Sequence, residues 1–186
     1  MSIINGLEIK NGKLIKCYSI KNSITIPEGV SAIGCKAFAD RSALTSVSIP
    51  CSVRVIENEA FSFCEALEEV SIPDGVISIE KFCFTGCRSL KAVTISDSVI
   101  SIGSGAFTYC TSLKTVTCPK HLEARIKELT AALNVNIIIT PPSVKKDFDG
   151  RITESFDGRI TESFDGRITE SFDGRITEPD TGKITE

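Results

Sequence analysis

The residues in this chain best suited to chemistry are its eight cysteines and its single histidine. Three of the cysteines, Cys64, Cys87 and Cys110, recur at intervals of 23 residues. If strand spacing carries through the turns, they lie about 4.8 Å apart in a line, whereas a zinc site needs about four converging ligands. Cys83 and Cys87 form a C-x3-C pair, which is a weak metal signal. We therefore expect no metal and no other cofactor, and buried thiols that pack as small apolar groups.

The other cysteine question is whether the chain contains disulfides. An even number of cysteines in a small secreted chain would suggest them, but the N-terminus MSIINGLEIKNGKLIKC lacks a charged segment followed by an apolar one. We therefore expect reduced thiols and a cytoplasmic location; the alternative is the cell surface, or export by a non-Sec route. Cys35 and Cys51 do not follow the repeat, so we expect them to be exposed and the most reactive.

No catalytic set can be assembled around the histidine. His121 is expected to begin a helix, no Ser/His/Asp or Cys/His arrangement is evident, and no glycine-rich phosphate loop is present. We predict that the chain is not an enzyme, and stoichiometric zinc would be needed to revive thiol or zinc chemistry. The formal charge of -3 argues against nucleic acid as a partner, and no run of roughly 18 apolar residues is present to span a membrane.

A repeat of 23 residues between Ile24 and Thr117 must position all of these side chains. Four apolar columns define it, and a fixed period of this length indicates a solenoid in which each unit buries its apolar face against its neighbours. The columns comprise an aromatic (Phe38, Phe61, Phe84, Phe107), a strand isoleucine (Ile26, Ile49, Ile72, Ile95), a valine (Val30, Val53, Val76, Val99) and a second isoleucine (Ile33, Ile56, Ile79, Ile102).

The units read ITIPEGVSAIGCKAF, VSIPCSVRVIENEAFSFC, VSIPDGVISIEKFCFTGC and VTISDSVISIGSGAFTYC. This motif resembles the BspA-like leucine-rich repeat family, with small departures at Cys83 and Ser96. The resemblance implies a right-handed solenoid with parallel β-strands on one side and irregular or short helical turns on the other. It also implies a non-catalytic role in protein interaction, of an adhesin-like or host-interacting kind, in proteins that are often bacterial.

Both ends of the solenoid (24–117) are predicted to be capped. Within 1–23, the Asn11-Gly12 pair separates two alternating segments and is typical of a type I′ β-hairpin. Within 118–140, leucines and isoleucines at helical spacing precede the segment Val135–Ile139, which predicts a helix and then a strand. We interpret both as covers for terminal coils that would otherwise expose apolar surface.

The candidate binding face consists of strand side chains that point away from the core. These are polar, acidic in the middle coil and basic in the next two, and we expect a polar, salt-sensitive protein partner. A purely structural role as solvent-facing strand residues and cross-strand charge partners is the alternative. The predicted residues are Thr45, Ser46, Ser48, Glu68, Glu69, Ser71, Lys91, Thr94, Lys114 and Thr117.

A tandem array of octapeptides occupies the region 141–186. FDGRITES begins at Phe148, Phe156 and Phe164, and FDGRITEP begins at Phe172. Few apolar groups per octapeptide and a glycine in each predict disorder rather than a β-meander. The alternative function for the whole chain is a scaffold or spacer whose repetitive tail is the multivalent partner-binding element; a neutral expansion of the array remains open as well.

Overall fold

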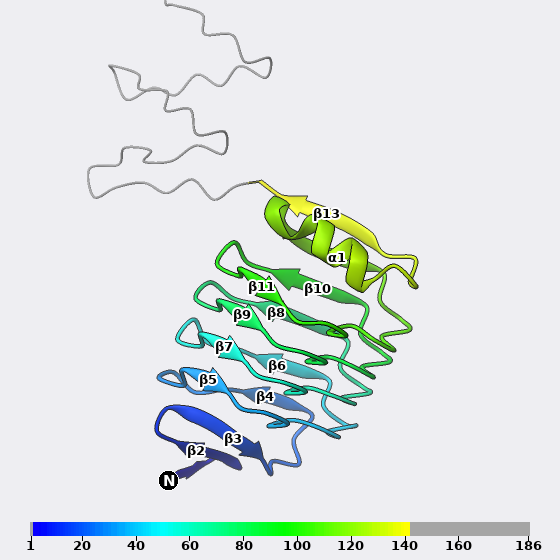
Figure 1. Cartoon of the computed structure of the whole chain (residues 1–186). Coiled ribbons are helices and arrows are strands. Elements are labelled where there is room, and N and C mark those ends of the chain that lie inside the picture. The colour runs from blue at the N-terminus through cyan, green and yellow to red at the C-terminus, as the bar shows by residue number, and fades with distance from the viewer. Residues whose placement is uncertain (1, 142–186) are drawn as a thin grey trace, which may run out of the picture. The chain divides into compact units, whose positions relative to one another are not determined.

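The computed structural model describes residues 2–141 of the 186. The octapeptide array lies outside the described residues. The predictions made for it, disorder rather than a β-meander and a multivalent tail or a neutral expansion, therefore lie outside them as well. The described part is a stack of coils that rises from the N-terminal strands to a C-terminal helix and strand (Figure 1). The predicted leucine-rich repeat solenoid is confirmed.

The main strands of successive coils stack in parallel along one side of the solenoid. Their order gives a two-stranded sheet, β4-β6, and a four-stranded sheet, β8-β10-β12-β13, with no strand ladder between β6 and β8. From β8 to β12 each strand is shifted by 23 residues, as in the pairs of Val93 with Val70 and with Val116, whereas β13 is shifted by 21 from β12. The strands are β4 (Ser23–Thr25), β6 (Ser46–Ser48), β8 (Glu69–Ile72), β10 (Ala92–Ile95), β12 (Thr115–Pro119) and β13 (Asn136–Thr140).

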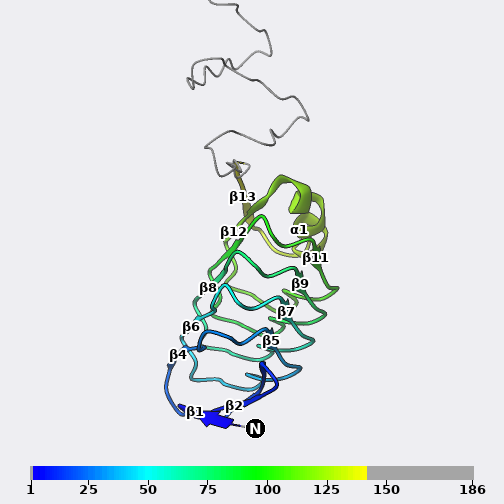
Figure 2. The same ribbon diagram turned by 90° about the vertical axis from the view of Figure 1, so that its left-hand side faces the viewer.

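A second parallel sheet runs along the opposite side, where the resemblance implied irregular or short helical turns. The turns are present, but each coil also contains a two-residue strand, and Figure 2 shows these strands facing the main ones across the core. They are β5 (Ala32–Ile33), β7 (Val55–Ile56), β9 (Ser78–Ile79) and β11 (Ser101–Ile102). Each contributes one buried isoleucine of the predicted column, so the columns line a core between two sheets.

The N-terminal hairpin is confirmed and extended. Strands β2 (Leu7–Lys10) and β3 (Lys13–Cys17) are antiparallel, and Asn11 and Gly12 have the positive φ values, 52° and 75°, that a type I′ turn requires. A further strand, β1 (Ser2–Ile4), pairs with β2 and was not predicted from the sequence. Because β3 pairs in parallel with β5, the hairpin continues the second sheet.

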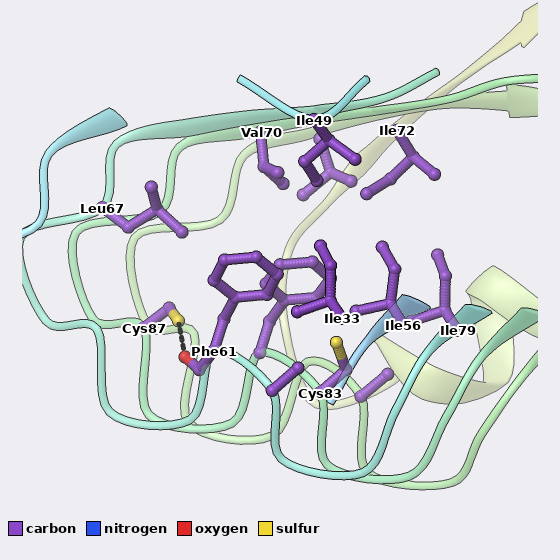
Figure 3. Packing of buried hydrophobic residues seen from close by; sticks show 14 of the residues in the cluster. Ile33, Ile49, Ile56, Phe61, Leu67, Val70, Ile72, Ile79, Cys83 and Cys87 are labelled. Carbon is purple, nitrogen blue, oxygen red and sulfur yellow. Dashed lines mark hydrogen bonds between the residues drawn. The ribbon is translucent and has the colours of Figure 1, made fainter. Parts of the chain in front are cut away.

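The aromatic column forms a continuous stack through the core. Rings of Phe38, Phe61, Phe84 and Phe107 are fully buried and nearly parallel, with successive centroids 4.9, 5.3 and 5.9 Å apart. Figure 3 shows the ring of Phe61 in the core, below Ile49 and Val70 on the side of the main strands. The rings of Phe61 and Phe84 therefore stack on the coils before and after them, and those of Phe38 and Phe107 on one neighbouring coil, which ties adjacent coils together.

The C-terminal cap consists of η1 (Lys120–Leu122), α1 (Glu123–Leu129) and β13, which pairs in parallel with β12. The predicted helix and strand are thus confirmed. Arg125 donates through Nε to the carbonyl of Ile102 at 2.9 Å. In earlier coils the equivalent carbonyl accepts a backbone N–H, as Ile79 does from Gly103 at 2.7 Å. A side chain of the cap therefore replaces the backbone of the coil that would come next.

Candidate interaction surface

The predicted binding face lies on the solvent side of the main strands. All ten of its residues are exposed except Thr117, which is half-buried. The alternation of exposed and buried residues along β8, from Glu69 to Ile72, shows why: successive side chains of a strand point to opposite faces. The structure divides the face, however, because Ser46 and Ser48 lie on β6 and the later residues lie beyond the break between β6 and β8.

The charged side chains of this face are only partly paired. Lys91 Nζ lies 2.8 Å from Glu68 Oε2 in the preceding coil, which confirms the predicted cross-strand partnership. Within residues 2–141, neither Glu69 nor Lys114 forms an ion pair. One negative and one positive group, two coils apart on either side of the coil of β10, thus remain available to a partner.

Some hydroxyl groups of the face already have partners within the solenoid. Ser46 Oγ lies 2.8 Å from Ser23 Oγ in the preceding coil, and Thr45 Oγ1 donates to the carbonyl of Asn22 at 3.1 Å. These contacts join β4 to β6 on the solvent side. The N-terminal part of the face therefore contributes more to the solenoid itself, and the charged part beyond β6 is the better candidate for binding.

The buried cysteine column is structural in its contacts. The thiols of Cys64, Cys87 and Cys110 donate to the carbonyls of the aromatic residues one coil earlier, each at 3.1 Å, and Figure 3 shows the Cys87 contact to Phe61. Burial raises the pKa of Cys64 to about 12 and likewise that of Cys110 to about 12. These groups remain protonated thiols at neutral pH, and a thiol in this state is neither a nucleophile nor a metal ligand.

The remaining thiols and the histidine have different surroundings. Cys35 and Cys51 are exposed, as predicted. His121 Nε2 lies 2.8 Å from the carbonyl of Val99. Serine occupies the same position of the repeat in two earlier coils. There Ser52 and Ser98 donate to the carbonyls of Val30 and Val76, each in the preceding coil, at 2.9 and 2.8 Å. The histidine thus continues a ladder of side chains that satisfy carbonyl groups. Within residues 2–141, no group of three or more His, Cys, Asp or Glu side chains is placed to hold a metal ion.

A set of exposed aromatic residues at the turns was not predicted from the sequence. Phe63, Phe82 and Tyr109 are 43%, 45% and 69% exposed, and all three have positive φ. The rings of the two phenylalanines lie over Gly86 and Gly105 of the next coil, where a Cβ atom would meet ring carbons at 2.5 and 2.3 Å. Glycine suits both positions, because the ring leaves no room for a Cβ atom where it now lies and because Gly86 and Gly105 have positive φ, 74° and 69°.

No helix within the described part of the chain is long and apolar enough to cross a membrane.

Comparisons with known proteins show which proteins the repeat resembles. No curated protein sequence matches the chain significantly. Among solved structures, it is similar to a leucine-rich repeat protein from Bacteroides ovatus at 33% identity and a TM-score of 0.56, covering 62% of this chain and 30% of that one. It also resembles the leucine-rich repeat protein of T. pallidum at 20% identity and a TM-score of 0.52, covering 70% of this chain and 75% of that one.

The chain thus spans about a third of the length of the Bacteroides ovatus protein, and at 20% identity the T. pallidum protein shows the fold alone. A family model provides the stronger result. The model for the BspA type leucine-rich repeat region matches residues 7–145 in six copies, which include the N-terminal hairpin and the C-terminal helix and strand. The chain therefore belongs to the BspA type leucine-rich repeat family.

Proposed function

We propose that this protein is a non-catalytic interaction module that binds another protein through the solvent side of its main strands. Support comes from membership of a leucine-rich repeat family and from the geometry of β8, β10 and β12. Parallel strands hold the backbone on a fixed spacing of about 4.8 Å, so a partner meets a rigid backbone surface and little backbone freedom is lost on binding.

The observation that carries this proposal is the charge pattern of the face. Glu69 and Lys114 have no ion-pair partner within residues 2–141, and Lys91, which pairs with Glu68, lies on the one coil between them. A partner with complementary charges would pair with the two free groups and align along the strands. Since all of these groups are exposed, we expect binding to weaken as salt is added.

The experiment is a capture assay with the full chain and three variants. The first variant exchanges the charges of the face, with Glu69→Lys and Lys114→Glu. The control exchanges the turn-side pair Glu65→Lys and Arg88→Glu, whose ion pair of 3.7 Å can reform with reversed polarity. Partners retained by the control and lost with the face variant support the proposal. Equal retention by both variants contradicts it.

The third variant tests the alternative in which the octapeptide array carries the interaction. It replaces the phenylalanine of each full octapeptide by serine, at Phe148, Phe156, Phe164 and Phe172. Loss of all partners in this variant alone would transfer the function to the array, through multivalency rather than through the solenoid. An adhesin-like or host-facing role is the finer form of the proposal; it requires a cell-surface or exported location, which labelling of intact cells with an antibody against the chain would test.

A further inference from the structure

The C-terminal strand β13 is an open edge of its sheet. It stands last in the order β8-β10-β12-β13 and, within residues 2–141, pairs only with β12. Its sequence, NIIIT, is uncharged and rich in β-branched side chains. Edge strands are usually protected by charge, proline or a covering element, because their free N–H and C=O groups can pair with another chain. Here the first such feature is Pro141, one residue beyond the strand.

The apolar side chains of this strand are less well covered than those of the coil before it. Ile137 and Ile139 are half-buried, whereas Val116 and Cys118, which pair with them on β12, are fully buried. Ile138 is 45% exposed. A hollow between α1 and β13 is lined in part by Ile137 and by two further half-buried residues of this end, Leu133 and Val135. The final coil therefore presents apolar surface that the cap does not cover.

A polar atom of the same strand also lacks a partner. Thr140 Oγ1 is inaccessible to solvent, and no described residue forms a hydrogen bond with it. Such groups are uncommon in native proteins because an unmade buried hydrogen bond is unfavourable. The Thr140 hydroxyl therefore lacks a hydrogen-bond partner, donor or acceptor, in the described part of the chain.

We propose that β13 pairs with β13 of a second copy of this chain, antiparallel and with the two-fold axis at Ile138. In this register Ile138 faces Ile138 of the second copy, Ile137 faces Ile139, and Asn136 faces Thr140. Directly opposite residues of an antiparallel pair lie with Cβ atoms about 5 Å apart. A rotation of the Thr140 side chain that turns Oγ1 outward would bring it within reach of the Asn136 amide of the second copy.

The chemistry of the strand favours an identical partner. Because β13 has no charged residue, two copies meet without like charges opposite one another. The two-fold arrangement uses the same surface on both chains, so it closes as a dimer and covers both apolar ends at once. Pro141 lacks an N–H group and ends the pairing at five residues.

Sedimentation velocity of the full chain between about 1 and about 200 µM tests this pairing, because the population of a dimer rises with concentration. We expect a concentration-dependent dimer for the wild type. Ile138→Lys and Ile138→Asp place like charges at the two-fold axis, so each variant alone should be monomeric, while an equimolar mixture should form a heterodimer. Ile100→Lys is the control, since Ile100 is 71% exposed and lies outside β13; it should dimerise as the wild type does.

Circular dichroism of each variant should match the wild type, because position 138 is partly exposed. A wild type that remains monomeric over the whole range would overturn the proposal, as would a dimer insensitive to Ile138→Lys. Assemblies larger than a dimer would indicate head-to-tail stacking instead and would also overturn it. Failure of the mixture to associate would exclude the antiparallel register centred on Ile138.

Discussion

Truncation of one ring in the aromatic stack should destabilise the whole solenoid. Phe61 is fully buried and stacks on rings at 4.9 and 5.3 Å on its two sides. Replacing a buried phenylalanine by alanine costs about 3–5 kcal/mol, as the sum of lost transfer free energy and the cavity left behind. Since whole domains are stable by only about 5–15 kcal/mol, we expect Phe61→Ala to remove a large part of the stability.

The loss of stability should depend on where the truncated ring lies in the stack. Phe107 is at the end of the column and stacks on one ring only, 5.9 Å away. An aromatic pair contributes about 0.5–1.5 kcal/mol beyond the area it buries, so Phe107→Ala should cost less than Phe61→Ala by about that amount. Phe61→Leu fills most of the cavity and should cost far less than the alanine variant.

Urea unfolding of the full chain, followed by far-ultraviolet circular dichroism, measures these differences. Phe63→Ala provides the control, because this ring is 43% exposed and lies outside the stack. The midpoint should fall most for Phe61→Ala, less for Phe107→Ala and least for Phe63→Ala. An unchanged midpoint in Phe61→Ala, or a loss equal to that of Phe63→Ala, would refute the assignment of the aromatic column as the link between coils.

Three further predictions concern the thiols and the C-terminal cap. In the native protein a thiol reagent should label only the exposed Cys35 and Cys51, with the six buried thiols reacting after unfolding; more than two rapid thiols would contradict the structure. Hydrogen bonds from two flanking lysines lower the pKa of Glu123 from 4.5 to about 2, so its contribution to stability is present above about pH 4.5 and is lost as the pH falls toward 2. Glu123→Gln should flatten that part of the stability curve, and an identical curve would exclude this origin. His121→Ala leaves the carbonyl of Val99 without its partner and should cost about 0.5–1.5 kcal/mol in urea unfolding, whereas His121→Ser should retain the contact if the serine ladder extends to this coil.

Much of the candidate surface followed from the repeat, but its details did not. The positions of Glu68 and Lys91 one period apart were enough to predict their ion pair, because parallel strands in register place such residues opposite one another. The break between β6 and β8 could not be predicted from the sequence, because the 23-residue repeat and its apolar columns continue across it without a change. Whether the face binds a protein remains a prediction.

The exposed aromatic residues show a second limit of the periodic argument. Phe63 and Phe82 are separated by 19 residues rather than 23, so they occupy different columns and appear unrelated in the sequence. Only the coiled structure places each of them over a glycine of the next coil. The signal available beforehand was the glycine one period after each ring, at Gly86 and Gly105.

The amino-acid sequence alone determined the architecture of this protein, because apolar columns with a fixed period can be buried only by stacking one coil on the next. It also specified the N-terminal hairpin, since Asn-Gly accepts the positive φ of the turn. Tertiary structure decided the rest: two-residue strands such as β11 are too short to show a period, and they exist because neighbouring coils supply their hydrogen bonds. The same holds for His121 and Arg125, whose roles arise from carbonyl groups that the last coil leaves unpaired.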